Sequence, residues 1–111
     1  ETGKTAMKIL FDPGLVRMTE GCQEAFRKTA KGYNLCGKVV ELYGEFLPFL
    51  ERHLSGDWGD LEYEEDRDAN DASVHTGRRL LSEYHLSDGT RIWVITEGDR
   101  SATTFLLPEE Y

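Results

Sequence analysis

A chain of 111 residues has the length of one domain, and its content of 39% hydrophobic and 31% charged residues is typical of a globular protein. No apolar run approaches the roughly 20 residues that a membrane-spanning helix needs, which argues against a membrane protein. The formal net charge of −8 disfavours direct binding to nucleic acid or to anionic membranes, but it suits a basic protein partner. We expect a cytoplasmic protein without a cofactor.

The chain is predicted to form a single α+β domain over residues 7–111. Residues 1–6 lack the apolar core of a signal peptide, and we expect them to precede a native start at Met7. Cys22 and Cys36 have neither Cys-x-x-Cys spacing nor paired histidines nearby. Two reduced thiols are therefore favoured over a disulfide or a metal role.

The first half of the chain predicts one strand followed by helices. Residues 15–18 follow a Pro-Gly turn and are expected to form a strand, after which Thr19 is a good N-cap for a helix that ends at Gly32. Residues 33–44 fit a short helix that begins near Asn34, although Val39 and Val40 also suit a strand.

A second amphipathic helix is predicted over residues 45–54, with Pro48 tolerated in its first turn. A weaker helix is predicted over residues 66–75, with Ala69 and Ala72 on its inner face and Gly77 at its end.

The last third of the chain predicts a three-stranded antiparallel meander that the N-terminal strand and helices cover. Two alternating runs, 80–87 and 90–96, flank Asp88-Gly89, a pair typical of a two-residue type I′ turn, and a third strand is expected over 102–107. Both Trp58 and Trp93 are predicted to be mostly buried. The covered face is expected to consist of Leu80, Tyr84, Leu86, Ile92, Val94, Phe105 and Leu107.

Residues 56–71, named here the acidic segment, join the helical half to the strand-rich half. Against the single cation Arg67, this segment carries eight carboxylates, which is a formal charge of −7 out of the total of −8. The carboxylates are those of Asp57, Asp60, Glu62, Glu64, Glu65, Asp66, Asp68 and Asp71. The flanking regions are nearly neutral, so this segment is the main electrostatic feature of the sequence.

The second half of the chain contains a series of short motifs that together are specific. They are Phe49-Leu50-Glu51-Arg52-His53, Gly56-Asp57-Trp58-Gly59, Glu65-Asp66-Arg67, Arg79-Leu80-Leu81-Ser82, Trp93-Val94-Ile95-Thr96-Glu97, Asp99-Arg100-Ser101 and Leu106-Leu107-Pro108-Glu109-Glu110-Tyr111. Through these motifs, residues 46–111 resemble a family of small bacterial proteins of plasmids and other mobile elements, the "plasmid-related proteins". The first half fits more loosely, since Glu20-Gly21 stands where Pro-Gly is usual. That family has no established activity, so the resemblance implies a context of mobile elements and no mechanism.

Two places could hold a functional site. The Gly-Asp-Trp-Gly turn at 56–59 is either a binding loop or a core anchor between two glycines. The loop at 96–101 brings together acids, a cation and hydroxyls, and it is either a small site or a locally hydrogen-bonded turn. Arg67 and Arg100 are expected to pair with acids of the acidic segment. No calcium-loop or zinc spacing is present, and His53, His75 and His85 are expected at the surface or at helix ends.

The preferred function is that of a non-catalytic interaction protein that binds a basic partner, in one version by mimicking DNA phosphate against a host defence enzyme. The predicted contact residues are Asp57, Trp58, Asp60, Glu62, Glu64, Glu65 and Asp68, with Glu97, Asp99, Arg100 and Ser101 as a second candidate loop. The competing hypothesis is a metal-assisted hydrolase built on Asp57, Asp60, Glu97 and Asp99.

Overall fold

A computed structural model describes residues 8–29, 31–35, 38–42 and 45–111. The helices are α1 (Glu20–Thr29), α2 (Phe46–Leu54), α3 (Glu64–Thr76) and the 3-10 helix η1 (Pro108–Glu110). The strands are β1 (Leu15–Met18), β2 (Lys31–Leu35), β3 (Lys38–Leu42), β4 (Leu80–His85), β5 (Arg91–Thr96) and β6 (Ala102–Leu106). The predictions for residues 1–6 and for Cys36 lie outside the described residues.

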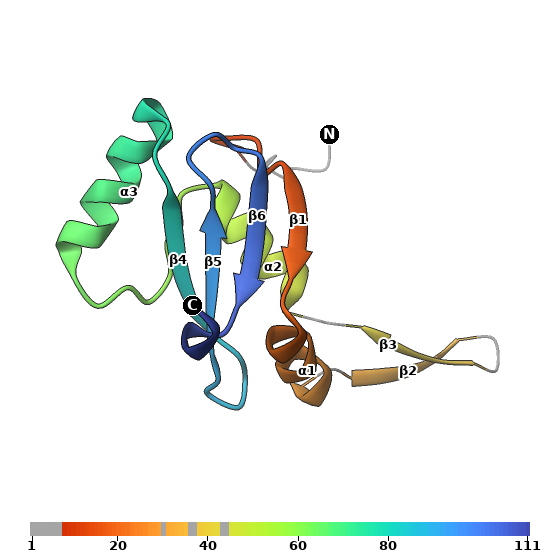
Figure 1. Ribbon diagram of the computed structural model, residues 1–111. Helices are drawn as coiled ribbons and strands as arrows, with labels where there is room; N and C mark the ends of the chain where they lie inside the picture. The colour runs from red at the N-terminus through yellow and green to blue at the C-terminus, as the bar shows by residue number, and fades with distance from the viewer. Residues whose placement is uncertain (1–7, 30, 36–37, 43–44) are drawn as a thin grey trace, which may run out of the picture.

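Four strands form one mixed sheet in the order β1-β6-β5-β4 (Figure 1). The antiparallel meander of β4, β5 and β6 is present, while β1 pairs in parallel with β6, with Leu15 opposite Ala102. The α+β class is confirmed. The N-terminal strand, however, extends the sheet to four strands, whereas the sequence predicted that it packs on a three-stranded meander.

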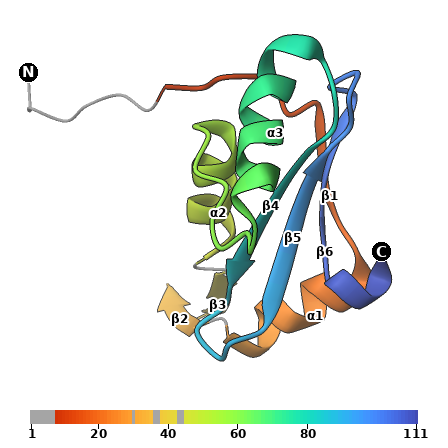
Figure 2. The same cartoon turned by 90° about the vertical axis from the view of Figure 1, so that its left-hand side faces the viewer.

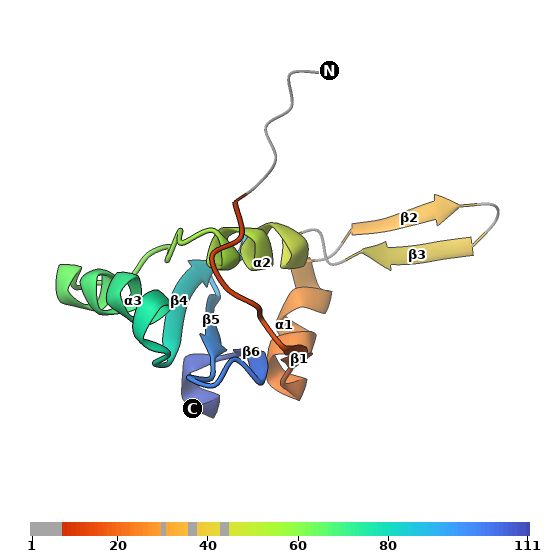
Figure 3. The ribbon, with the colours of Figure 1, turned by 90° about the horizontal axis from the view of Figure 1, so that it is seen from above.

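The main core lies between the sheet and helices α1 and α2, and α2 is on the face opposite η1 (Figure 3). Phe26 of α1 contacts both Phe105 of β6 and Phe49 of α2, and Phe49 stacks on Tyr84 with ring centroids 4.8 Å apart. The predicted covered face is confirmed, because Leu80, Tyr84, Leu86, Ile92, Val94 and Phe105 are buried. Leu107 packs against the main core, while Leu80 belongs to a second cluster around Trp58.

Helix α1 begins as predicted, because the backbone N–H of Cys22 donates to Thr19 Oγ1 at 3.2 Å. The carboxylate of Glu110 supplements this cap by accepting from the backbone N–H of Gly21 at 3.1 Å. The predicted end of the helix was wrong. Helix α1 ends at Thr29, and Gly32 lies inside strand β2.

The helix predicted from Asn34 is also wrong, because residues 31–35 and 38–42 form a hairpin in which Tyr33 is opposite Val40. Residues 36, 37, 43 and 44 lie outside the described part. The apolar positions of this region fit both periodicities, and the β-branched pair Val39-Val40 favours the strand. The hairpin projects away from the four-stranded sheet (Figures 1 and 3).

The β4–β5 hairpin has a loop one residue longer than predicted. Leu86 N–H donates to the Thr90 carbonyl, Gly89 N–H donates to the Leu86 carbonyl, and Gly89 has φ +90°. This is a three-residue turn with glycine in the left-handed position, and it shifts the register so that Tyr84 is opposite Ile92. The two-residue Asp88-Gly89 turn was therefore wrong, although the inward residues of both strands are those expected.

Helix α3 begins at Glu64, two residues earlier than predicted, and ends as predicted before Gly77, which has φ +73°. The predicted inner face of α3 was wrong. Ala69 and Ala72 are exposed, whereas Asn70 and Ser73 are buried. The Asn70 side chain binds both the N–H and the carbonyl of Leu81, which attaches the helix beside strand β4 (Figure 2). A polar residue is thus the inward anchor of a helix with little apolar surface.

Trp58 is buried, as predicted, but Trp93 is only partly buried. Trp93 lies opposite Glu83 on the sheet face that points away from Ile92 and Val94, and its ring meets Tyr111 edge-on at 5.6 Å. Ile92 and Val94 lie inward as the alternation of β5 predicts, and the same alternation places Trp93 on the opposite face, which α1 and α2 do not cover.

Trp93→Ala should therefore lower the free energy of unfolding by about 1–2 kcal/mol, less than the roughly 3–5 kcal/mol expected for a fully buried tryptophan. Urea unfolding of this variant beside Trp58→Ala measures the difference. A larger loss for Trp93→Ala than for Trp58→Ala would contradict the assignment of faces.

Candidate functional site

The first part of the acidic segment is attached to the free edge of β4 by backbone hydrogen bonds. Asp60 N–H donates to the Glu83 carbonyl at 2.7 Å, and Glu83 N–H donates to the Trp58 carbonyl at 3.1 Å, which makes an isolated parallel bridge between Gly59 and Glu83. Gly59 has φ +77°, and a Cβ there would lie 2.0 Å from the Glu83 carbonyl oxygen. Only glycine allows this close approach.

Trp58 is the core anchor of the turn and is not available as a contact surface. It is 3% exposed, it stacks on Phe11, and its Nε1–H donates to Asp71 Oδ1 at 2.9 Å. Of the two readings of the Gly-Asp-Trp-Gly motif, the structure supports the core anchor. The Trp58 side chain, predicted to contact a partner, is therefore buried inside the protein.

The two arginines bind backbone carbonyls, which corrects the prediction that they pair with acids. Arg67 donates to the carbonyl of Gly59 at 2.6 Å. Arg100 donates to the carbonyls of Ser73 and Arg78, each at 2.7 Å, and so it closes the C-terminal end of α3. The Arg67 guanidinium thus holds the turn of the acidic segment by binding its backbone.

Three carboxylates of the acidic segment have structural partners. Asp57 pairs with Arg52 at 2.8 Å, and this hydrogen bond holds the pKa of Asp57 below its usual range. Asp60 accepts from His85 Nδ1 at 2.8 Å, and Asp71 accepts from Trp58. These three residues fix the fold of the segment.

The remaining five carboxylates form what we call the acidic surface. All of these side chains are exposed, and within the described part of the chain none has a cation within ion-pair distance. The neighbouring Arg67 is partly buried and directed at carbonyls. The acidic surface consists of Glu62, Glu64, Glu65, Asp66 and Asp68.

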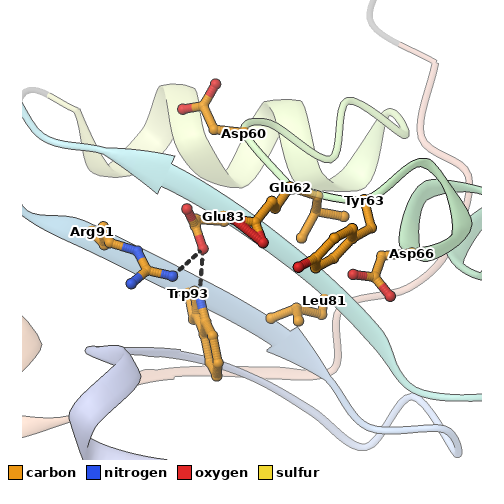
Figure 4. A pocket seen from close by; sticks show the side chains of 9 residues that line it. Asp60, Glu62, Tyr63, Asp66, Leu81, Glu83, Arg91 and Trp93 are labelled. Carbon is orange, nitrogen blue, oxygen red and sulfur yellow. Dashed lines mark hydrogen bonds and ion pairs between the residues drawn. The ribbon is translucent and has the colours of Figure 1, made fainter.

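A pocket of about 580 Å³, named here the β4 pocket, borders this surface (Figure 4). One wall is the segment that leads into α3, and the floor consists of side chains on the outward face of β4 and β5. Its lining is Asp60, Leu61, Glu62, Tyr63, Asp66, Leu81, Glu83, Arg91 and Trp93. The alternation of β5 indicates that Arg91 and Trp93 point outward, but only the register shows that Glu83 stands opposite Trp93.

Glu83 is the central polar group of the β4 pocket, and its side chain is 12% exposed. Its Oε1 accepts from Arg91 at 2.9 Å and from Trp93 Nε1 at 2.9 Å. Burial works to raise the pKa of Glu83, but these two hydrogen bonds outweigh it and hold the pKa below its usual range. Glu83 therefore stays ionised and fixes the Trp93 ring and the Arg91 guanidinium.

His53, expected at the surface or at a helix end, is instead fully buried between α2 and the sheet. Its Nδ1 is 2.6 Å from Ser82 Oγ and its Nε2 is 2.9 Å from Thr96 Oγ1. Thr96 and Thr103 hydroxyls lie 2.7 Å apart, and Thr103 donates to the Pro13 carbonyl. Because each hydrogen bond needs one proton, the bond from Thr103 to the Pro13 carbonyl fixes the direction of the others. Thr96 donates to Thr103, the Nε2–H of His53 donates to Thr96, and Ser82 donates to Nδ1 of His53.

This arrangement keeps His53 neutral. Burial, and secondly the charge of Arg100, lowers the pKa of His53 to about 3. Although Ser82 and His53 are a hydroxyl and an imidazole in contact, both are 0% exposed, so no substrate reaches them. We interpret this series of hydrogen bonds as a structural link between α2, the sheet and the N-terminal segment.

The loop at 96–101 is a locally hydrogen-bonded turn. Ser101 N–H donates to Asp99 Oδ1 at 2.9 Å, Glu97 faces Arg79 at 3.5 Å, and Arg100 holds φ +62° through its carbonyl contacts. The four carboxylates of the hydrolase hypothesis have separate partners on different elements. Among the described residues, no group of three histidine, cysteine or acidic side chains could hold a metal ion.

Burial raises the pKa of the Cys22 thiol to about 12, which keeps it protonated in the core.

In the described ranges, no helix combines the length and the apolar character that a bilayer crossing requires. Comparison of the chain with protein-family models, with curated proteins and with solved structures finds no match. The resemblance to plasmid-related proteins stays a prediction.

Proposed function

We propose that this protein is a non-catalytic interaction module whose acidic surface binds a basic partner protein. The observation that carries the proposal is the state of the five carboxylates from Glu62 to Asp68, which are exposed and without a cation among the described residues. Like charges so close together repel one another and disfavour folding, so a partner that neutralises them gains attraction that the isolated protein lacks.

One version of this proposal is mimicry of a nucleic acid. The acidic surface lies on one turn and on the start of α3, where Glu64, Glu65 and Asp66 occupy the first helical turn. Carboxylates fixed on a rigid element can occupy a groove that normally receives phosphates. In the context of a mobile element, the partner would be a DNA-binding enzyme of the host.

Neutralising the acidic surface should abolish salt-sensitive capture of basic proteins. The test variant is Glu62→Gln/Glu64→Gln/Glu65→Gln/Asp68→Asn, and the measurement is a pull-down from host lysate at 0.05 M and 0.5 M salt, followed by Kd measurement with each purified candidate. Because screening shortens from about 14 Å to about 4 Å over this range, capture by wild type should fall steeply with salt.

The matched control is Glu20→Gln/Glu45→Gln/Glu51→Gln/Glu109→Gln, which changes the net charge by the same amount outside the acidic segment. Equal loss of binding in both variants would indicate an effect of net charge alone. Retention of every salt-sensitive partner by the test variant would refute the role of the acidic surface.

A further inference from the structure

We propose that the β4 pocket binds an arginine side chain of the basic partner. This inference rests on the proposed function and adds to it the chemical group that is recognised. The pocket volume of about 580 Å³ lies in the range of ligand sites, and the pocket opens beside the acidic surface, with which it shares Glu62 and Asp66.

Charge is the first argument. Four carboxylates and one guanidinium line the β4 pocket, which gives it a formal charge of −3. The one cation, Arg91, is already held by Glu83 Oε1 at 2.9 Å. Asp60 is occupied by His85, while Glu62 and Asp66 have no cation among the described side chains. Glu62 is hydrogen-bonded to the Tyr63 side chain, but that neighbour is neutral, so a cationic group that enters the pocket meets two carboxylates that no described cation neutralises.

The aromatic lining favours a guanidinium over an ammonium. Tyr63 is 59% exposed, and in Figure 4 its ring and that of Trp93 lie on two sides of the Leu81 side chain. A planar, weakly hydrated guanidinium stacks on such rings, whereas a lysine ammonium is more strongly hydrated and has no flat face.

Glu83 supplies an acceptor at the floor. Both of its hydrogen bonds from described residues go to Oε1. Its Oε2 faces the His85 ring at 3.9 Å, which is beyond hydrogen-bond distance. This second oxygen belongs to a carboxylate that is fixed in place and largely shielded from water. A guanidinium that reaches the floor can therefore donate to Oε2 without displacing Arg91.

The test is an NMR titration of the ¹⁵N-labelled full chain at 0.05 M salt. The probes are three capped pentapeptides, Gly-Gly-Xaa-Gly-Gly, in which Xaa is arginine, lysine or the neutral isostere citrulline. The Trp93 indole N–H, which donates to Glu83, should shift on addition of the arginine peptide, while the buried Trp58 indole stays in place. Arginine should bind at least threefold more tightly than lysine and tenfold more tightly than citrulline.

Two pairs of substitutions separate the pocket from the acidic surface. Glu62→Gln/Asp66→Asn removes two carboxylates that line the pocket, and Glu65→Gln/Asp68→Asn removes two that do not. All four side chains are exposed, so both variants should keep the dispersed spectrum of the folded protein. The pocket pair should lose at least tenfold in affinity for the arginine peptide, and the other pair less than threefold.

Equal losses in the two pairs, or binding of the peptide with the Trp93 indole unmoved, would overturn the pocket and leave the acidic surface as proposed. The absence of any arginine binding would also overturn the pocket. The proposed function fails separately if the Glu62→Gln/Glu64→Gln/Glu65→Gln/Asp68→Asn variant keeps every salt-sensitive partner in the pull-down.

Discussion

Gly59→Ala should lower the free energy of unfolding by about 3–5 kcal/mol, since a left-handed alanine is strained by roughly 1–2 kcal/mol and overpacking adds a similar amount or more. The new Cβ would lie 2.0 Å from the Glu83 carbonyl oxygen and 2.6 Å from the Tyr84 ring. Neither can retreat easily, because Glu83 is part of β4 and Tyr84 is fully buried. Chemical denaturation followed by circular dichroism measures the loss.

Gly89→Ala is the matched control. Gly89 also has a positive φ, +90°, but nothing lies within 4 Å of a Cβ placed there. Its substitution should therefore show the conformational strain alone, about 1–2 kcal/mol. Equal losses in the two variants would mean that the contact of Gly59 with β4 contributes nothing.

Acidification should destabilise the protein through His53. Folding lowers the pKa of His53 from 6.5 to about 3. Below pH 6.5 the unfolded chain therefore binds a proton at His53 that the folded protein does not bind. The free energy of unfolding then falls as pH falls, with a limiting slope of about 1.4 kcal/mol per pH unit. Between pH 6 and pH 4.5 the loss from this one group should be about 2 kcal/mol.

Urea unfolding of wild type and His53→Gln at several pH values isolates this effect. Glutamine does not titrate, so the variant should be less stable at pH 7 and should show a much weaker pH dependence between pH 6 and pH 4.5. The carboxyl groups with lowered pKa, such as Asp57 and Glu83, act in the same direction, but they do so below about pH 4.5, where carboxylates protonate in the unfolded chain. An unchanged slope in His53→Gln would show that another group is responsible.

The sequence was sufficient for features with local signals. The apolar spacing of Cys22, Ala25 and Phe26 indicated α1, and the alternation around Tyr84 and Ile92 indicated the hairpin and its covered face. The turn was misjudged because Asp-Gly is compatible with both a two-residue loop and a three-residue loop, and only strand packing selects between them. Residues 31–35 and 38–42 were misjudged because their apolar positions fit either periodicity.

Features that depend on distant contacts could not be predicted. Nothing near Leu15 indicates that β1 pairs in parallel with β6, and nothing near His53 indicates that it contacts two hydroxyls from two different strands. Acidic residues were correctly identified as the main feature of residues 56–71, but their division into carboxylates with and without a structural partner depends on Arg52, His85 and Trp58. An arginine that binds carbonyls has the same local sequence as one that pairs with an acid.

The pairing of β1 with β6 also has a consequence for the order in which the protein folds. Leu15 and Ala102 are neighbours in the sheet, so the edge beside β6 cannot close until the residues of β6 have left the ribosome. The β4–β5 hairpin, by contrast, joins residues close in sequence and can form early. Closing so long a loop carries a high entropic barrier, which slows folding of sheets with distant strand pairs. During synthesis, the apolar side chains of β1 and α1 therefore stay uncovered until β6 is available. The nascent chain most needs a chaperone during this interval.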